Sequence, residues 1–300
     1  MKTFQLKNDS IQAEFLAYGA VLHKLWVKDK KGNPINVIMG LSQPEDYLSD
    51  GWSRGAVIGR FAGRLENPIQ IIDQKISIEN NEGVLLHSGS SGWNKKVWEV
   101  EKHNSDQIQF SIRCPKGSSG FPGSVKALVS YTLKDSVLSI HYQATTDQST
   151  HINLTNHAYF NLNPQGKIAD QLLKVNADQM LELKETLVPT GVQNAVEGSP
   201  YDFRKERTIA QTQLDDYFIV KQNGEALATL YSKESGIKMS TYSNQPGVVV
   251  FTPPHFEAIC FETQKFSNSP NIPHFPTTLI RPEDRYDHQT RFEFSVKDEY

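Results

Sequence analysis

The sequence predicts an all-β protein, a sandwich or barrel of mostly antiparallel strands, and three features of its 300 residues support this. Apolar and polar residues alternate with a period of two in many short runs. Turns rich in glycine, proline and asparagine separate those runs. Apolar residues with helical spacing never extend beyond two turns, so the one helix expected is a short turn at residues 44–48.

The clearest runs follow one another as hairpins. Residues 108–112, 125–133 and 138–142 each place apolar side chains on one face, and a polar turn at 134–136 joins the last two. Closely spaced strands of this kind pair antiparallel. Further strands are expected at residues 69–78, 172–175, 226–231, 237–242 and 248–252.

Nothing in the chain marks a domain boundary, so we expect one domain over residues 1–300. There is no repeat of fixed period, no low-complexity segment and no linker-like stretch. Two long stretches, 40–55 and 263–281, look irregular. Long ordered loops on a β scaffold often carry function.

The composition argues against several classes of protein. The net charge is −3 and no cluster of Lys and Arg forms a basic stripe, so we expect no nucleic-acid partner. No apolar run is long enough to span a membrane, and the first residues lack the apolar core of a signal peptide. Cys114 and Cys260 show no metal-ligand spacing and are expected to be free thiols, which favours a cytoplasmic protein.

Residues 153–162 form the most polar of the expected strands, with His157 among three asparagines and a threonine. Buried polar atoms must all find partners, so a strand this polar usually faces a polar ligand. Asn153 also begins a glycosylation acceptor pattern, but that interpretation needs a secreted protein.

Three shorter segments carry further candidates, each with a plainer alternative. Arg60 and Arg64 flank a glycine and could bind hydroxyls or carboxylates, or could simply be solvated. His87 ends an apolar run at a glycine turn, where a histidine is more often structural. Asp215 and Asp216 begin an apolar run, where paired carboxylates are most simply a strand-initiating turn.

Glu262 is the strongest acidic candidate, because it follows the apolar residues 258–261 and precedes a proline-rich loop. A carboxylate there needs partners or its pKa rises, and both situations suit proton transfer; a structural ion pair is the alternative. His87, His157 and Glu262 could in principle bind a metal, but their wide separation in sequence makes that weak, and we expect no metal.

The chain lacks a Walker loop, a dinucleotide-binding glycine motif, a zinc-protease motif and a hydrolase nucleophile elbow. What it offers is an acid, a base and many neutral hydrogen-bonding groups. This combination suits proton transfer on a polyhydroxy substrate without a cofactor.

Taken in order, a set of short segments resembles the aldose 1-epimerases, or mutarotases, of the galactose mutarotase-like group. The segments cover nearly the whole chain: 59–64 (Gly-Arg-Phe-Ala-Gly-Arg), 86–89 (Leu-His-Ser-Gly), 96–98, 120–123, 153–162, 188–191, 202–204, 215–218, 261–264 (Phe-Glu-Thr-Gln), and 269–271 through 281–282. The resemblance implies a large β-sandwich, the supersandwich of that group, with an open sugar-binding cleft. It also implies interconversion of the anomers of free aldohexoses such as glucose or galactose, and leaves monomer and homodimer both open.

The resemblance implies roles for particular residues. His157 matches the general acid of the family, and Glu262 matches its general base. Three residues match sugar-binding positions: Arg64, His87 and Asp215, with Asp216 as the alternative to Asp215. These roles require an ionised Glu262, which a nearby arginine would favour, and a His157 that holds a proton near neutrality, which a nearby carboxylate would favour.

The chain departs from the family pattern at three positions. Gly63 and Ser88 stand where many members have asparagine and glycine, and Val249 stands where many have a substrate-contacting glutamine. The sequence therefore leaves the preferred sugar open. It also leaves three other functions open: a non-catalytic sugar-binding module, a glycoside hydrolase using Glu262 and Asp215, and a hexose-phosphate 1-epimerase, which would need extra cations.

Overall fold

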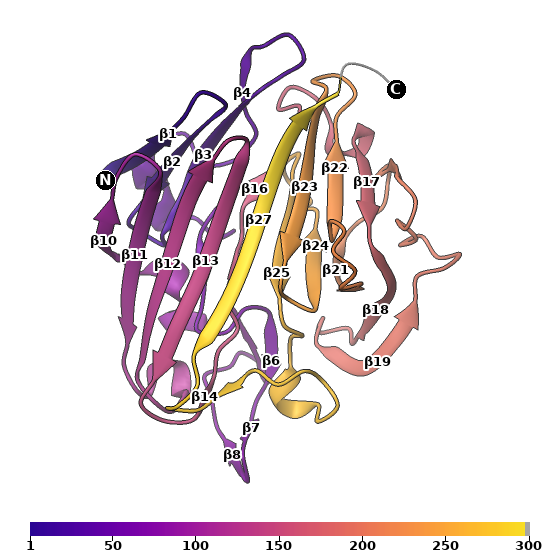
Figure 1. The fold of residues 1–300 in the computed structure, drawn as a ribbon. Helices are drawn as coiled ribbons and strands as arrows, with labels where there is room; N and C mark the ends of the chain where they lie inside the picture. The colour runs from indigo at the N-terminus through magenta and orange to yellow at the C-terminus, as the bar shows by residue number, and fades with distance from the viewer. Residues whose placement is uncertain (298–300) are drawn as a thin grey trace.

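The structure is a computed structural model that describes residues 1–297, and strands make up most of its regular structure. Two antiparallel sheets form its body (Figure 1). The larger has nine strands, in the order β10 (Glu99–His103), β11 (Gln107–Cys114), β12 (Val125–Lys134), β13 (Val137–Thr146), β27 (Tyr286–Val296), β23 (Ile237–Ser243), β22 (Ala228–Tyr231), β17 (Leu172–Val175) and β20 (Arg207–Thr208). The smaller has six, in the order β16 (Tyr159–Phe160), β25 (Ile259–Gln264), β24 (Gly247–Phe251), β21 (Asp215–Val220), β18 (Ala177–Leu183) and β19 (Pro189–Ala195).

Shorter elements surround the two sheets. A four-stranded sheet contains β1 (Thr3–Lys7), β2 (Ile11–Leu16), β3 (Val21–Lys28) and β4 (Pro34–Asn36). The two-stranded pairs are β5 (Val57–Ile58) with β15 (Thr155–Asn156), β6 (Arg64–Glu66) with β9 (Val84–Leu86), β7 (Ile69–Ile71) with β8 (Gln74–Ile76), and β14 (Thr150–His151) with β26 (Leu279–Ile280). The short 3₁₀ helices are η1 (Pro44–Ser49), η2 (Gly89–Ser91), η3 (Trp93–Lys95), η4 (Ser118–Gly120), η5 (Ile168–Asp170) and η6 (Ser269–Asn271). None of the helices in residues 1–297 has the length and apolar character needed to cross a membrane.

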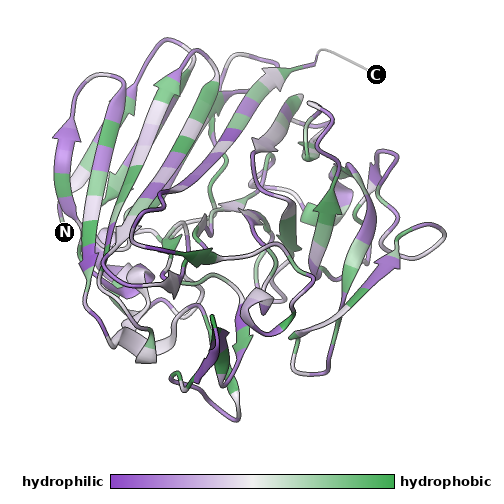
Figure 2. Cartoon of the chain, turned by 60° about the horizontal axis from the view of Figure 1, so that its bottom comes forward, coloured by the Kyte–Doolittle hydropathy of each residue, from purple (hydrophilic) through white to green (hydrophobic). Residues whose placement is uncertain are grey.

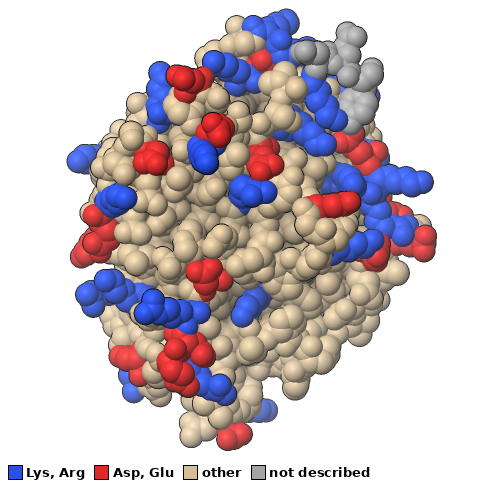
Figure 3. Space-filling model, viewed as in Figure 1, with Lys and Arg blue, Asp and Glu red and all other residues tan. Residues whose placement is uncertain are grey.

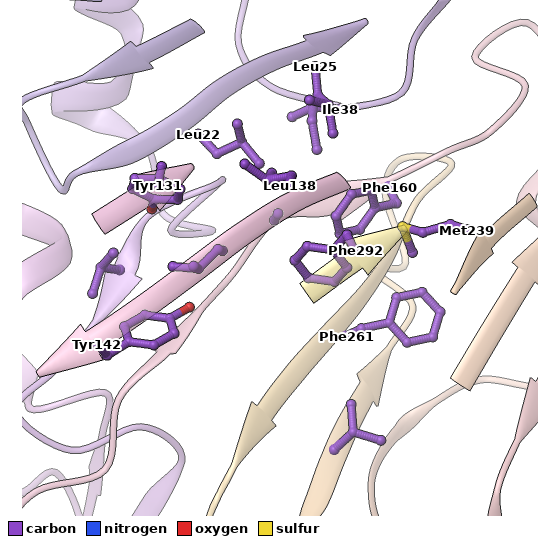
Figure 4. Close-up of a cluster of buried hydrophobic side chains, with 14 of the residues drawn as sticks. Leu22, Leu25, Ile38, Tyr131, Leu138, Tyr142, Phe160, Met239, Phe261 and Phe292 are labelled. Carbon is purple, nitrogen blue, oxygen red and sulfur yellow. The ribbon is translucent and has the colours of Figure 1, made fainter. Parts of the chain in front are cut away.

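The main core lies between the two large sheets. Phe160 joins them, with its ring centroid 5.0 Å from that of Phe292 on β27 and 6.4 Å from that of Phe261 on β25 (Figure 4). Leu22 and Leu25 of β3 belong to the same core (Figure 4). Burying each such side chain contributes about 1.5–3 kcal/mol. Figure 2 shows the alternation of hydrophobic and hydrophilic residues along the long strands that produces this core.

The surface carries both signs of charge. Basic and acidic side chains are interspersed on the face shown in Figure 3, in keeping with the small net charge of −3.

Most of the expected strands are confirmed. The runs at 125–133 and 138–142 lie in β12 and β13, which pair as the predicted hairpin. The run at 172–175 coincides with β17, and the helical turn at 44–48 lies in η1. The irregular stretch at 263–281 contains η6 and β26.

Two of the expected strands are wrong as single strands. Residues 69–78 form the hairpin of β7 and β8, because the chain turns at Ile72, whose φ is +53°. Residues 153–162 contain β15 and β16, and His157 lies between these two short strands. A continuous strand cannot form there because β15 pairs with β5, whereas β16 pairs with β25.

Alternation along the six-stranded sheet determines where the candidate site lies. Phe261 of β25 belongs to the main core, so its neighbour Glu262 projects from the opposite face. Val249 of β24 pairs with Glu262, and Tyr217 of β21 pairs with Val249. These three side chains therefore form a row across the outer face of the sheet, with a carboxyl group at one end.

Candidate active site

A pocket on this outer face brings together all five residues that the sequence selected. Strands β21, β24 and β25 contribute one wall, β6 and the residues after β9 contribute a second, and residues 183–189 contribute a third. The lining residues are Gly51, Trp52, Ser53, Gly63, Arg64, Leu86, His87, His157, Tyr159, Leu183, Leu187, Pro189, Asp215, Tyr217, Val249, Phe251, Glu262, Gln264 and Ser267. Segments far apart in the sequence therefore meet at one place.

The segment around His157 is fixed by its asparagines. The His157 carbonyl accepts the Gly55 N–H at 2.9 Å, and Asn156 Nδ2 donates to the Gly55 carbonyl at 2.8 Å. Asn153 donates to the Lys265 carbonyl at 3.1 Å and accepts the Lys265 N–H at 2.9 Å. Because Lys265 directly follows β25, Asn153 fixes the segment of the histidine relative to the strand of Glu262.

The imidazole of His157 points toward Glu262. Its Nε2 lies 3.4 Å from Glu262 Oε1, and both side chains are less than one-tenth exposed, at 7% and 5%. Its Nδ1 lies 3.5 Å from the sulfur of Cys260. Burial raises the pKa of that thiol well above its ordinary value, so it remains an S–H group. Tyr159 packs against the imidazole, with ring centroids 5.0 Å apart.

Burial determines the protonation of this pair. Burial and the charge of Asp215 raise the pKa of Glu262 to about 8, against a smaller lowering by Arg64. Burial lowers the pKa of His157 to about 4. Desolvation therefore opposes, in the free site, both the ionised Glu262 and the protonated His157 that the reaction requires. At neutral pH the 3.4 Å contact joins a carboxylic acid and a neutral imidazole, not an ion pair.

Arg64 and Asp215 form an ion pair on the pocket wall. Their closest nitrogen and oxygen are 3.5 Å apart, and the side chains are 25% and 32% exposed. Asp216 lines a neighbouring hollow instead, where its carboxylate accepts the N–H of Asp215 at 3.2 Å. The structure thus places Asp215, and not Asp216, around the same pocket as the histidines and Glu262.

His87 is arranged to donate a hydrogen bond. Its Nδ1 accepts the Gly63 N–H at 3.1 Å, so in the neutral ring the hydrogen is on Nε2. Burial lowers its pKa well below the ordinary value. His87, His157 and Glu262 each place one potential ligand atom within 4.8 Å of the other two, a spacing at which three side chains could bind one metal ion. The Gly63 N–H already occupies the lone pair that His87 would need, so the arrangement suits a hydroxyl or ether oxygen better.

Sequence reasoning missed Cys260, which contacts His157, and Ser267, which lines the pocket. Cys260 was treated only as a free thiol, although it lies two positions before Glu262 and therefore on the same face of β25, a signal that strand alternation provides. Ser267 lies in the loop after β25, and no pattern in the sequence marks it.

Comparison with known proteins shows the family to which the chain belongs. A family model described as aldose 1-epimerase matches residues 2–293. The galactose mutarotase of Sus scrofa is 34% identical over 325 aligned residues, covering 99% of this chain and 94% of the relative. The aldose 1-epimerase of Escherichia coli is 27% identical, covering 96% and 93%.

Solved structures show the same fold. A GalM/aldose epimerase homologue from C. elegans superposes with a TM-score of 0.94 at 29% identity, covering 99% of both chains. The galactose 1-epimerase of Lactobacillus acidophilus gives 0.87 at 25% identity, covering 97% of this chain and 93% of that one. The expected galactose mutarotase-like architecture is confirmed, and the chain belongs to the aldose 1-epimerase family.

Proposed function

We propose that this protein is an aldose 1-epimerase that interconverts the α and β anomers of free aldohexoses, acting as a single domain without a cofactor. One observation carries the proposal: His157 and Glu262 converge to 3.4 Å in a pocket that also holds His87, Arg64 and Asp215. An acid, a base and several hydroxyl-binding groups are what anomer exchange requires.

The proposed reaction opens and recloses the sugar ring. Glu262, as a carboxylate, takes the proton of the C1 hydroxyl, and His157 gives its Nε2 proton to the ring oxygen. The C1–O5 bond breaks and leaves the open-chain aldehyde. Rotation about C1–C2 presents the other carbonyl face, and reclosure with reversed proton roles gives the other anomer. Each positioned acid or base contributes about 10²–10⁴ in rate.

The pKa values of the pair fit this cycle. Ring opening leaves Glu262 protonated and His157 neutral, which is the state that burial favours in the free site. The ring-closed and open-chain complexes both hold one proton between the two side chains, so turnover needs no proton exchange with water. Sugar hydroxyls that donate to Glu262 then support its carboxylate form in the ring-closed complex.

Arg64, Asp215 and His87 are proposed to orient the sugar between acid and base, which supplies the positioning part of catalysis. Arg64 is the one Lys or Arg among the described residues that line the pocket, and Asp215 already pairs with it. A phosphate would therefore find no free cation there, which favours a free sugar over a hexose phosphate.

A cytoplasmic location is part of the proposal. The two free cysteines, Cys114 and Cys260, are both buried, which suits a reducing compartment. Monomer and homodimer are distinguished by light scattering on the purified protein.

The test is anomer exchange of freshly dissolved sugars, followed by polarimetry and by NMR saturation transfer between the anomeric protons. Glucose, galactose and their 6-phosphates are compared, with His157→Ala and Glu262→Gln as variants. Each variant should lose at least about 10² in kcat with an unchanged circular dichroism spectrum. A near-wild-type rate for Glu262→Gln would contradict the assignment of Glu262 as the general base. Saturable sugar binding without acceleration would indicate a binding module, and release of nitrophenol from aryl glycosides would indicate a hydrolase.

A further inference from the structure

A serine and a glutamine form a polar pair in the pocket beyond the acid and base. Ser267 and Gln264 both line the pocket, and Gln264 Nε2 donates to Ser267 Oγ at 3.1 Å. Gln264 is fully buried and Ser267 is 7% exposed. Within residues 1–297, Gln264 Oε1 has no hydrogen-bond partner. Buried amide oxygens nearly always have one, so this atom points to a missing ligand group.

The pair offers one donor and one acceptor. Ser267 Oγ accepts from Gln264, and among the described residues its own hydrogen has no recorded acceptor. A hydroxyl carries one hydrogen and two lone pairs, so the Ser267 hydrogen is available to a ligand, beside the unpaired oxygen of Gln264. A sugar hydroxyl satisfies both groups at once, because it can accept from Ser267 and donate to Gln264. A carbonyl or a carboxylate could satisfy only the donor.

Gly63 makes room for this pair. A Cβ at position 63 would lie 2.0 Å from Ser267 Oγ and 3.2 Å from Gln264 Nε2. Its φ of +82° is also a conformation that other residues adopt at a cost. The position of the Ser267 hydroxyl thus depends on a glycine that the sequence shows as a departure from the family pattern.

The position of Gln264 along β25 indicates which part of the sugar it faces. Gln264 is two residues beyond Glu262 on the same face of the strand, about 7 Å along it. This distance is comparable to the width of a hexose ring. With C1 held between Glu262 and His157, the pair lies at the side of the ring remote from C1.

We infer that Ser267, positioned by Gln264, is a specificity-determining residue that binds the sugar hydroxyl at C3 or C4. The inference rests on the proposed epimerase function and names a contact that sets its substrate preference. Losing one such hydrogen bond lowers kcat/KM by up to about tenfold.

The test combines removal of the Ser267 hydroxyl with removal of single hydroxyls from the sugar. Anomer exchange is measured for glucose and for 2-, 3- and 4-deoxyglucose, with the wild type and Ser267→Ala. The wild type should lose about tenfold on one of the 3- and 4-deoxy sugars relative to glucose. Ser267→Ala should lose about tenfold on glucose but lose nothing more on that same deoxy sugar, since the contact is already absent. Removal of the C2 hydroxyl should lower the kcat/KM of both proteins by the same factor.

Ser269→Ala is the matched control. The Ser269 hydroxyl donates to the Phe266 carbonyl at 2.7 Å, and Ser269 does not line the pocket. This variant should keep the wild-type pattern across the four sugars.

Three results would overturn the inference. Ser267→Ala could lose kcat/KM equally on all four sugars, or lose none on any of them. Its loss could also disappear on the 2-deoxy sugar instead of the 3- or 4-deoxy sugar. Kd values for the same sugars, measured by titration, test the Ser267 contact independently of epimerisation. A wild type that binds sugar with this pattern but does not exchange anomers would overturn the proposed function alone.

Discussion

Replacing Glu262 with glutamine should abolish activity and yet stabilise the fold, increasingly so as the pH rises. In the folded protein the pKa of Glu262 is raised to about 8, against an ordinary value of 4.5, because the carboxyl is buried. Between these pH values the folded state holds a proton that the unfolded chain has released. The free energy of unfolding therefore falls as the pH rises through this window. Glutamine does not titrate, so the free energy of unfolding of the variant does not fall in this way.

The magnitude follows from the two pKa values. Keeping the carboxyl protonated costs about 1.4 kcal/mol for each pH unit above its ordinary pKa of 4.5. The cost is therefore below about 1 kcal/mol at pH 5 and about 3 kcal/mol at pH 7. It levels off near about 5 kcal/mol once the pH passes 8, where the folded carboxyl itself ionises. Solvent screening does not reduce these values much, because the Glu262 side chain is 5% exposed.

Urea unfolding of the wild type and Glu262→Gln at pH 5, 7 and 9 measures this difference. The free energy of unfolding of the variant should exceed that of the wild type by an amount that grows by about 4 kcal/mol from pH 5 to pH 9. Glu225→Gln makes the same chemical change at an exposed position and serves as the control. A difference for Glu262→Gln that stays flat with pH would show that Glu262 is ionised in the folded protein and would refute the reasoning.

The kcat/KM of the wild type should be bell-shaped, falling below about pH 4, where His157 adds a second proton to the pair, and above about pH 8, where Glu262 loses the remaining one. A plateau that persists through pH 9 would contradict this. Cys260→Ala should lower kcat by up to about tenfold at constant KM, and Cys260→Ser should recover most of it, because a hydroxyl can also donate to the imidazole. Equal losses in both variants would indicate a packing role only. Asp215→Asn should raise KM about tenfold, whereas Asp216→Asn should change it less than about twofold; the reverse order would reassign the sugar-binding carboxylate.

The long hairpins were predictable because one face of each strand meets the core and the other meets solvent. In β12 this produces a regular period of two, and the predicted run at 125–133 differs from the strand by one residue. In β25 all six residues are buried, so burial alone gives no alternation from which to assign faces. Residues 153–162 were misjudged for a different reason. Their polar side chains bond to backbone groups such as those of Lys265, which are remote in sequence, and a local pattern cannot reveal them.

The candidate site was predictable in its residue types but not in its protonation. His157 and Glu262 stand in recognisable segments, and the structure places both at one pocket. Their pKa values, however, depend on how completely remote parts of the chain exclude water. Sequence reasoning considered only neighbouring charges, a nearby arginine for Glu262 and a nearby carboxylate for His157, whereas burial is the largest cause of the raised pKa of Glu262.

A neutral pair can hold this geometry because backbone contacts, not attraction between charges, keep the two side chains together. Asn153 bonds to both the N–H and the carbonyl of Lys265, so the segment of His157 is tied to the strand of Glu262 whatever their protonation. During the proposed cycle the pair passes between an ionic and a neutral form. An arrangement that relied on an ion pair would relax whenever the proton moved and would have to be restored in each turnover. The contacts of Asn153 with the Lys265 backbone avoid this rearrangement. The acid and base therefore remain 3.4 Å apart in the neutral form, in which they attract each other least.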